Sequence, residues 1–356
     1  MNSRDIIQRR LANQQLAASG FGDSPELVRW MGCIQAQDFA GAKWAVGNRI
    51  KGGSEAAIEK GFNEGRFLRT HVLRPTWHFV APEDIRWMLG LTGPRIKAFN
   101  KNYHRSLEIG PDVLKRSKTV LTKALTGGRH LDRKELAALL LKARINTDDI
   151  RLTFLLMDAE LDGLICSGPR KGKQFTYALL DERVAPAAVL SRPKALGELA
   201  KRYFTSRGPA TLPDFAWWGG LTLTDAREGL EYCRAQLQSE IVNGQAYWFS
   251  TEMHSPQKTA TAAATVLLLP AYDEYAVAYK DRSDIVPEGM ALKTGYSIFK
   301  PIIVVGGKVV GVWQRTLTKD GVAVETDIMS PLSKAAEKEI KVVIKQYADF
   351  LGKKAV

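Results

Sequence analysis

The stretch RFLRTHVLRPTWHFV (residues 66–80) decides the expected fold of the first part of the chain. It is rich in β-branched and aromatic residues and has Arg74-Pro75 in its middle, so we expect two strands joined by a turn. Helical segments precede this hairpin, at about residues 3–18, 24–34, 40–49 and 54–62. Helices followed by a hairpin are the order of elements in a winged helix.

The second of these helical segments has the strongest pattern. It begins with Ser24 and Pro25, an N-cap residue followed by proline at the first helical position. Its apolar residues then recur at i, i+3, i+4 and i+7: Leu27, Trp30, Met31 and Ile34. We therefore expect an amphipathic helix whose buried face runs through Ile34.

The same order of elements returns later in the chain. The second copy comprises helices at 131–143 and 151–161 and a hairpin at 163–180, and Asp132 with Glu135 forms a capping box. The third copy comprises helices at 193–206, 212–218 and 224–236 and strands near 239–250. Recurrence at intervals of roughly 90 residues suggests tandem modules, although no residue-level repeat accompanies it.

From residue 259 onward the chain is β-rich, and a final helix is expected at 331–351. Gly306-Gly307 between two Val/Ile runs predicts a hairpin turn, and it is no phosphate loop because it joins strand to strand. The expected fold is therefore α+β and mainly α: three tandem winged-helix modules followed by a β-rich C-terminal part. Their expected bounds are 1–90, 91–190, 191–258 and 259–356.

Charge and composition limit the classes of partner that the protein can have. The 356 residues include 51 Lys+Arg against 38 Asp+Glu, a formal charge of +13, which favours a polyanionic partner and nucleic acid first. The longest apolar run, at 262–269, is far shorter than the roughly 20 residues of a membrane span, and the N-terminus has no apolar signal core. Cys33, Cys166 and Cys233 lie far apart in apolar surroundings, as reduced core residues do. We expect a cytoplasmic monomer with no membrane partner.

Motifs for metal or nucleotide chemistry are absent from the sequence. There is no C-x-x-C pair, H-E-x-x-H, G-x-S-x-G elbow or Walker motif. The five histidines are dispersed over the chain: His71, His78, His104, His130 and His254. We therefore expect neither a metal site nor a cofactor.

Two groups of basic residues are candidates for phosphate contacts. Lys97, Lys101 and Arg105 recur at i, i+4 and i+8, which places them along one side of a helix. The second group lies at the tip of the 163–180 hairpin: Arg170, Lys171 and Lys173. A solvated helix face explains such a stripe about equally well, and the net charge favours nucleic acid.

The most unusual polar cluster is CIQAQD (residues 33–38). In an unbroken helix Gln35 and Gln37 lie about 200° apart, so they converge on one ligand only if the helix ends between them. Asp38 could be the N-cap of the next helix, and the glutamines could tie down that turn. Spacing alone favours this structural role.

Four segments together resemble the winged-helix DNA glycosylases of the AlkZ/YcaQ type. They occur in the same order and span both ends of the chain: IQAQD with the AKWAVGNRI that follows it, residues 67–89, LLLPAYDEYAVAYKDRS (267–283) and IIVVGGKVVGVWQR (302–315). The first two and the DEY-plus-KDR segment are fairly specific, whereas the last is weak by itself.

The resemblance implies three tandem winged helices and a β-rich C-terminal part that form a concave surface for double-stranded DNA. The family's catalytic motif is Gln-x-Gln in one branch and Gln-x-Asp in the other, and Gln35 and Gln37 match the first, AlkZ-like branch. That branch is associated with excising alkylated purines and, in some members, unhooking interstrand crosslinks. The family's lesion-side hairpin corresponds by position to residues 66–80, which carry His71, Arg74, Thr76, Trp77 and His78.

The residues suit this chemistry. A purine alkylated at N7 is cationic and departs neutral, so no strong general acid is needed. Glutamine is no base at neutral pH, so Gln35 and Gln37 would position the water that attacks the sugar. Asp38 would either polarise this water or cap the next helix, and we favour the cap. Bifunctional lyase activity is not expected, because the motif holds no lysine.

The hairpin residues are candidates for contacts with DNA, and some of them have a structural interpretation as well. Arg69 and Arg74 are candidates for contacts with DNA phosphates. Trp77 either stacks on DNA or is a half-buried strand residue. A histidine such as His78 is more often a strand residue with its hydrogen bonds satisfied than a catalyst. Asp273 and Glu274 in PAYDEY match the family pattern but have an ordinary turn role, and we assign them no catalytic function.

The expected function is therefore a monofunctional DNA glycosylase that releases N7- or N3-alkylated purines from double-stranded DNA, with a role in crosslink unhooking. The alternative is a winged-helix DNA-binding protein without catalysis, such as a transcriptional regulator. A regulator reads base edges, whereas a glycosylase binds the backbone and responds to damage.

Overall fold

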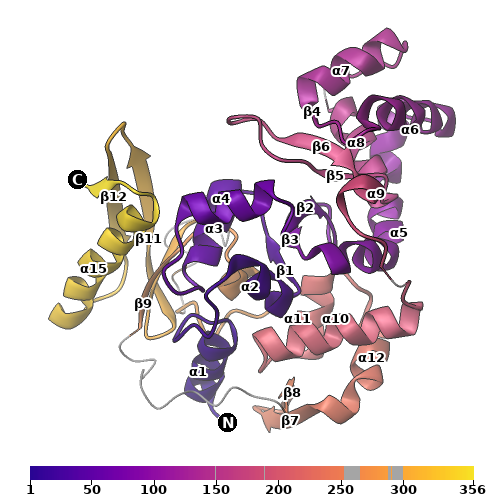
Figure 1. Ribbon diagram of the computed structural model, residues 1–356. Helices are drawn as coiled ribbons and strands as arrows, with labels where there is room; N and C mark the ends of the chain where they lie inside the picture. The colour runs from indigo at the N-terminus through magenta and orange to yellow at the C-terminus, as the bar shows by residue number, and fades with distance from the viewer. Residues whose placement is uncertain (149, 188, 252–264, 288–289, 291–299) are drawn as a thin grey trace. The chain divides into compact units, whose positions relative to one another are not determined.

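The computed structural model describes residues 1–148, 150–187, 189–251, 265–287, 290 and 300–356 (Figure 1). About 49% of the chain is helix and about 19% strand, so the expected mixed and mainly helical fold is confirmed. The chain divides into two compact units, Met1–Glu59 with Leu196–Val356, and Lys60–Ala195. His254 and residues 259–264, on which parts of the expectation rested, lie outside the described residues.

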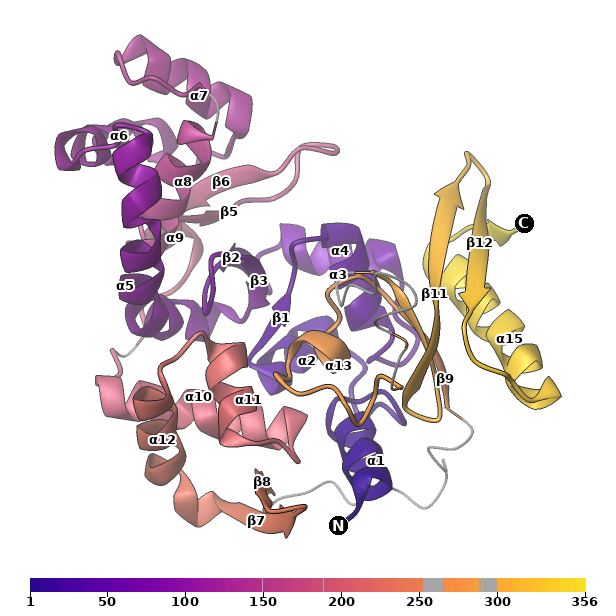
Figure 2. The same ribbon diagram turned by 180° about the vertical axis from the view of Figure 1, so that it is seen from behind.

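The first unit contains a five-stranded sheet in the order β13-β12-β11-β10-β9. Its strands are β9 (Val266–Leu269), β10 (Ile302–Val305), β11 (Lys308–Leu317), β12 (Gly321–Ile328) and β13 (Lys354–Ala355). Gly306 and Gly307 join β10 to β11 with positive φ angles, which confirms the predicted hairpin turn. Figure 2 shows the long β11–β12 hairpin. Pairing with β10 reaches only Val312 of β11, whereas pairing with β12 continues to Leu317.

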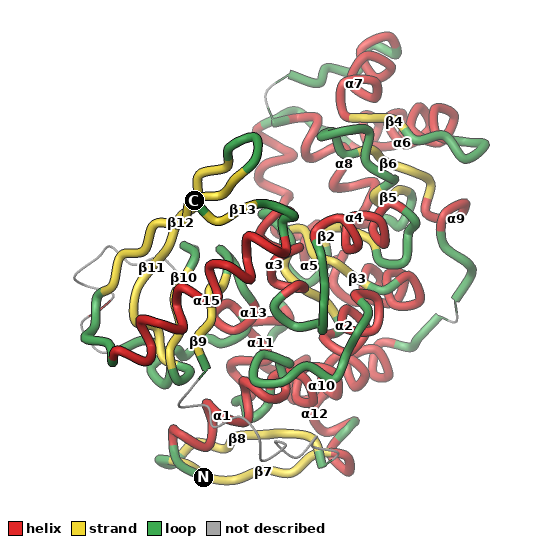
Figure 3. Tube along the Cα trace, turned by 60° about the vertical axis from the view of Figure 1, so that its left-hand side comes forward, coloured by secondary structure: helices red, strands yellow, loops and turns green. Residues whose placement is uncertain are grey.

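Two helices far apart in the sequence pack on this sheet. Apolar residues of α1 (Ser3–Asn13) share a buried cluster with β9 and β10, including Ile7, Leu11, Leu269 and Val304. Helix α15 (Lys334–Phe350) contacts β9 (Figure 3). Its Tyr347 and Phe350 rings pack against the ring of Trp44, which lies on α3 (Phe39–Gly47). The Trp44 Nε1–H donates to the backbone oxygen of Leu268 at 2.7 Å, so α3 is fixed against β9.

The remaining elements of this unit precede β9 in the sequence. They are α2 (Ser24–Met31), β1 (Cys33–Gln35), α4 (Glu55–Asn63, which crosses the unit boundary), α10 (Arg192–Arg207, which begins before it), α11 (Leu212–Gly219), α12 (Leu223–Tyr232), the 3-10 turn Arg234–Gln236, and the hairpin of β7 (Leu237–Val242) and β8 (Gln245–Ser250). Ala210 forms an isolated bridge with Trp248 of β8.

The second unit contains the predicted hairpin 66–80 and the second copy. Its elements are β2 (Leu68–His71), β3 (Trp77–Val80), α5 (Pro82–Ser106), α6 (Pro111–Leu125), β4 (Leu131–Asp132), α7 (Arg133–Lys142), α8 (Arg151–Leu161), β5 (Ile165–Ser167), β6 (Thr176–Leu179) and α9 (Leu180–Arg183). Both hairpins and the capping box of Asp132 with Glu135 are confirmed. Strands β4, β6 and β5 form one sheet in that order.

Along the chain, the order helix, strand, helix, helix, strand, strand occurs at α2 to β3 and again at α6 to β6. From α10 to β8 the same order holds if the Ala210 bridge is counted as the first strand. The expected module bounds at 90, 190 and 258 remain predictions.

The expected helix through Ile34 is wrong in its last turn. Helix α2 ends at Met31, Gly32 has φ +71°, and Cys33–Gln35 form a strand. Glycine adopts a positive φ without the clash that a Cβ would bring, so Gly32 can turn the chain out of the helix. The N-cap of α2 is Asp23 and not Ser24, which is already helical.

All three cysteines are free and buried, as expected of core residues. Burial raises the pKa of Cys166 to about 12 and that of Cys233 to about 11. No helix among the described residues is both long enough and apolar enough to span a membrane.

Candidate active site

The Gln-x-Gln segment lies at the junction of β1 and α3. Gln35 is the last residue of β1, and its buried side chain accepts a hydrogen bond through Oε1 from the backbone N–H of Gln37 at 3.1 Å. Gln37 and Asp38 are exposed. Gln35 therefore ties down the turn, as one of the two interpretations expected, while the next two side chains reach the surface.

Asp38 occupies the N-cap position of α3, but its side chain makes no capping hydrogen bond. Its carboxylate lies over the first turn of the helix, where a Cβ on Gly41 would come within 2.6 Å of Asp38 Oδ2. The expected capping bond is thus not formed. Asp38 therefore places its carboxyl group at the N-terminal end of α3 without closing the cap.

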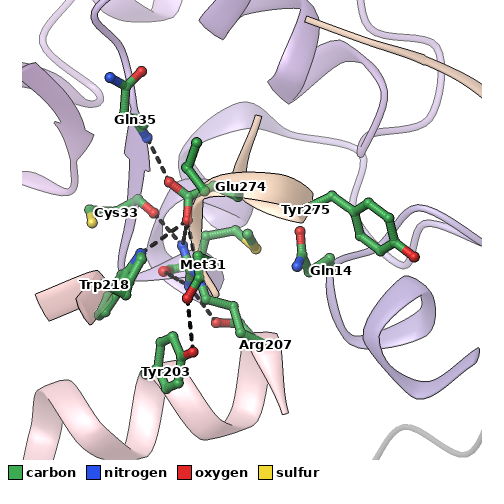
Figure 4. A network of polar contacts seen from close by, with 12 residues as sticks. Gln14, Met31, Cys33, Gln35, Tyr203, Arg207, Trp218, Glu274 and Tyr275 are labelled. Carbon is green, nitrogen blue, oxygen red and sulfur yellow. Dashed lines mark hydrogen bonds and ion pairs between the residues drawn. The ribbon is translucent and has the colours of Figure 1, made fainter. Parts of the chain in front are cut away.

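A buried ion pair lies behind this segment (Figure 4). Glu274, the first residue of α13 (Glu274–Val277), accepts the backbone N–H of Gln35 through Oε1 at 2.9 Å. Its other oxygen, Oε2, accepts from Arg207 Nη2 at 2.6 Å and from Trp218 Nε1 at 3.0 Å. Arg207 and Glu274 are 0% and 1% exposed, so the charges are matched inside the protein.

The same arginine fixes the turn between α2 and β1. Arg207 Nη1 donates to the backbone oxygen of Met31 at 2.6 Å, and Nη2 donates to that of Cys33 at 2.7 Å. These two carbonyls flank Gly32, whose positive φ ends the helix. The path of the chain into the candidate motif is therefore defined by a side chain from α10.

A second buried ion pair adjoins the first. Asp273 accepts from Arg49 Nη1 and Nη2 at 2.8 and 2.7 Å and also caps α13 by accepting the backbone N–H of Tyr275. The turn role expected for Asp273 is confirmed. The expectation missed that both Asp273 and Glu274 are buried and paired with arginine. The signal was present in LLLPAYDEYAVAY, because carboxylates within an apolar run need buried partners.

The hairpin residues form a cluster of cation–π and ring contacts in the second unit. The Arg69 guanidinium lies between two rings, 4.2 Å from the centre of Trp77 and 4.6 Å from that of Phe175. The His71 ring packs against Trp77 in a tilted arrangement, with the ring centres 4.4 Å apart, and its Nδ1 contacts Glu160 Oε2. Trp77 is thus half-buried and Arg69 is 7% exposed, so Arg69 contributes to packing as well as charge.

The other hairpin candidates occupy less specialised positions. His78 is a fully buried strand residue, and its Nδ1 contacts the backbone oxygen of Thr76 at 2.9 Å. Arg74 is half-buried in the turn. Their contacts with DNA remain predictions.

The expected stripe on α5 is divided by an acidic pair. Lys97 forms ion pairs with Asp158 and Asp162, which also bind Lys118. The other two residues of the stripe, Lys101 and Arg105, are exposed, and so is Arg95 on the same helix.

At the tip of the second hairpin, Arg170 packs on Phe175 and donates to the backbone oxygen of Lys173 at 2.7 Å. Lys171 pairs with Glu135 at 3.1 Å, and Lys173 is exposed. Within the described residues, no group of three or more His, Cys, Asp or Glu side chains could hold a metal ion.

Comparison with known proteins gives a consistent picture. The family model described as "DNA glycosylase AlkZ-like" matches residues 28–350. A curated relative, the interstrand DNA cross-link repair glycosylase of Streptomyces sahachiroi, is 25% identical over 328 residues, which cover 87% of each chain. The solved structure of the Streptomyces sahachiroi DNA glycosylase AlkZ superposes with a TM-score of 0.82 at 19% identity and covers 100% of this chain and 98% of that one, so the fold is shared.

Proposed function

Because the chain belongs to the AlkZ-like DNA glycosylase family, we propose that it excises purines alkylated at N7 or N3 from double-stranded DNA and unhooks interstrand crosslinks. Gln35 and Gln37 position the water that attacks the anomeric carbon. Asp38 supplies the negative charge that polarises this water or offsets the charge of an oxocarbenium-like transition state. The crosslink activity is carried over from the name of the Streptomyces relative.

The observation that carries the proposal is the arrangement at the β1–α3 junction. The Oε1 atom of Gln35 is engaged by the backbone of Gln37, which leaves the Gln35 amide group as the donor for a bound water. Asp38 makes no capping bond and is exposed beside Gln37. This geometry favours the catalytic role of Asp38 over the cap role that spacing had favoured.

The chemistry needs little more than this arrangement. A cationic alkylpurine leaves as a neutral base, so the enzyme must orient water and stabilise positive charge on the sugar. Two amides and a carboxylate do both without a metal. We propose a monofunctional enzyme, because residues 34–38 contain no lysine that could form a Schiff base.

DNA binding is proposed to use the expected basic residues. Exposed Lys101, Arg105 and Lys173 are the best placed for phosphate contacts, whereas the ion pairs of Lys97 and Lys171 weaken their attraction for DNA. Arg69, Arg74, Trp77 and His78 would contact the DNA near the lesion. The recurring order of elements supports three tandem winged helices, and we propose a monomer.

The test is alkali-revealed strand cleavage of an oligonucleotide that carries one N7-methylguanine, with a nitrogen-mustard crosslinked duplex in parallel. Wild type should create abasic sites, and Gln35→Ala, Gln37→Ala and Asp38→Asn should each lose this activity while they still bind DNA. No release from either substrate, together with tight binding to one undamaged sequence, would instead favour a non-catalytic regulator.

Gly41→Ala separates the position of Asp38 from its chemistry. The added Cβ would lie 2.6 Å from Asp38 Oδ2, so the carboxylate must move although it keeps its charge. Alanine is the better helix former, so we expect slower base release without lost helix stability. Wild-type rates in Gly41→Ala would argue against a catalytic role that depends on the present position of Asp38.

A further inference from the structure

We infer that Arg207 and Glu274 are positioning residues for the glutamine motif: their buried ion pair sets the backbone of residues 31–35, and with it the place of Gln35 and Gln37. The inference rests on the proposed function of those glutamines. It goes beyond that function because it assigns a role in base release to two residues that lie outside the motif.

Three backbone groups of the segment bind to the pair. The oxygens of Met31 and Cys33 accept from Arg207 at 2.6 and 2.7 Å, and the N–H of Gln35 donates to Glu274 at 2.9 Å. These groups lie on both sides of Gly32 and at the last residue of β1. The pair therefore fixes both the turn that ends α2 and the strand that follows.

The pair itself is rigidly held. Arg207 Nε and Nη2 both donate to Glu274 Oε2, at 2.9 and 2.6 Å, and the guanidinium lies 4.4 Å from the Trp218 ring centre. The Tyr279 hydroxyl donates to the backbone oxygen of Arg207 at 2.9 Å. Charge-assisted hydrogen bonds are stronger than neutral ones, and buried packing around them restricts the movement of the segment that they support.

The Arg207–Glu274 pair acts on the glutamine motif through the backbone and does not contact a reacting group. In Figure 4 the side chain of Gln35 points away from Glu274, and only its backbone N–H meets the carboxylate. The Gln35 side chain in turn accepts from the backbone of Gln37. A shift of the strand would therefore displace both glutamines together.

The neighbouring pair provides a matched control. Arg49 and Asp273 are also buried, at 1% and 2% exposed, and Asp273 directly precedes Glu274. Their further bonds go to the backbone oxygen of Ala45, the side chain of Gln14 and the N–H of Tyr275. Arg49→Lys thus makes the same chemical change as Arg207→Lys beside the same dipeptide, on a pair bonded to other segments.

The experiment compares these two variants of the full-length chain in single-turnover base release from N7-methylguanine DNA. Lysine cannot bond two carbonyls and a carboxylate in the fork geometry of arginine. We expect Arg207→Lys to lower the maximal rate by about 10- to 100-fold with the Kd for the damaged DNA nearly unchanged. Arg49→Lys should leave the rate within about twofold of wild type, although both variants lower the melting temperature.

Hydrogen exchange at the Gln35 amide provides a readout independent of activity. It should accelerate in Arg207→Lys and stay protected in Arg49→Lys. If wild type releases no base, the proposed function fails, yet protected exchange in both variants would separately overturn the positioning role. Equal loss of rate in the two variants would also overturn it. Glu274→Gln with Asp273→Asn as its control repeats the comparison if Arg207→Lys does not fold.

Discussion

The β1 segment and the β2–β3 hairpin both carry candidate site residues, but different interactions define them. In the hairpin, Leu68 pairs with Val80 and His71 with Trp77, so the paired strand residues lie at most 12 positions apart. Residues 31–35 instead bond to Arg207 and Glu274, which lie 174 and 239 positions away from Cys33 and Gln35. Pairing between neighbours in the sequence thus sets the backbone path of the hairpin, although Arg69 and His71 also contact Phe175 and Glu160. The path into the glutamine motif depends on side chains from distant segments.

Removal of the distant partner should have the largest effect. Glu274→Ala leaves the buried charge of Arg207 uncompensated and removes the acceptor of the Gln35 N–H. We expect the free energy of unfolding of the first unit to fall by about 3 to 5 kcal/mol. Urea unfolding combined with hydrogen exchange of peptides from each unit measures it, and the 68–80 peptides should keep their protection.

A loss below about 1 kcal/mol would contradict the proposed difference between the β1 segment and the β2–β3 hairpin, because the loss of a surface ion pair costs no more than that. It would mean that residues 31–35 find their path by local preference alone.

This difference explains what the sequence could predict. The two hairpins, the capping box of Asp132 and the turn at Gly306-Gly307 depend on neighbours in the chain, and each was predicted correctly. The end of α2 was not, because the helical spacing from Leu27 to Ile34 continues past Gly32. Gly32 permits the turn, and the contacts with Arg207 and Glu274 hold the chain in the strand that follows.

The candidate site divides in the same way. Resemblance to a family nominated Gln35 and Gln37, and Asp38 was added as the nearest possible base. The Gln35 to Gln37 bond and the missing cap bond of Asp38 are properties of the folded chain. The role of Glu274 could not be derived from a local pattern. Its acidic side chain in an apolar run indicates a buried partner without naming which arginine supplies it.

Gly32→Ala perturbs the same segment by straining its backbone. Gly32 has φ +71° and ψ −54°, a conformation that a residue with a Cβ adopts only under strain. We expect a loss of about 2 to 3 kcal/mol and slower base release, because the chain must relax at the turn. Thermal unfolding and single-turnover rates check both. Gly127→Ala, at a positive φ on the second unit, is the control that should lower stability without slowing release.

Ser167→Ala asks whether the hairpin also needs a distant partner. Ser167 Oγ accepts the backbone N–H of Arg69 at 2.9 Å across 98 positions. Because the strands pair independently of this bond, we expect a loss of only about 1 kcal/mol and unchanged β2–β3 exchange. A loss as large as that of Glu274→Ala would show that the hairpin depends on remote contacts to the same extent as the β1 segment.

The smallest effect is expected at Asp162, where a distant partner is half exposed. Burial alone would raise the pKa of this carboxyl, but hydrogen bonds from Lys118 and Lys97 outweigh it and lower the pKa below its ordinary value of 3.8. Its stabilisation is therefore present above that value and is lost as the pH falls through the lowered pKa. Asp162→Asn should cost less than about 1 kcal/mol at neutral pH, because the side chain is 39% exposed. Urea midpoints of variant and wild type should converge in acid. A difference that persists there would assign the stabilisation to packing, and remote charge would then matter in this molecule only where it is buried.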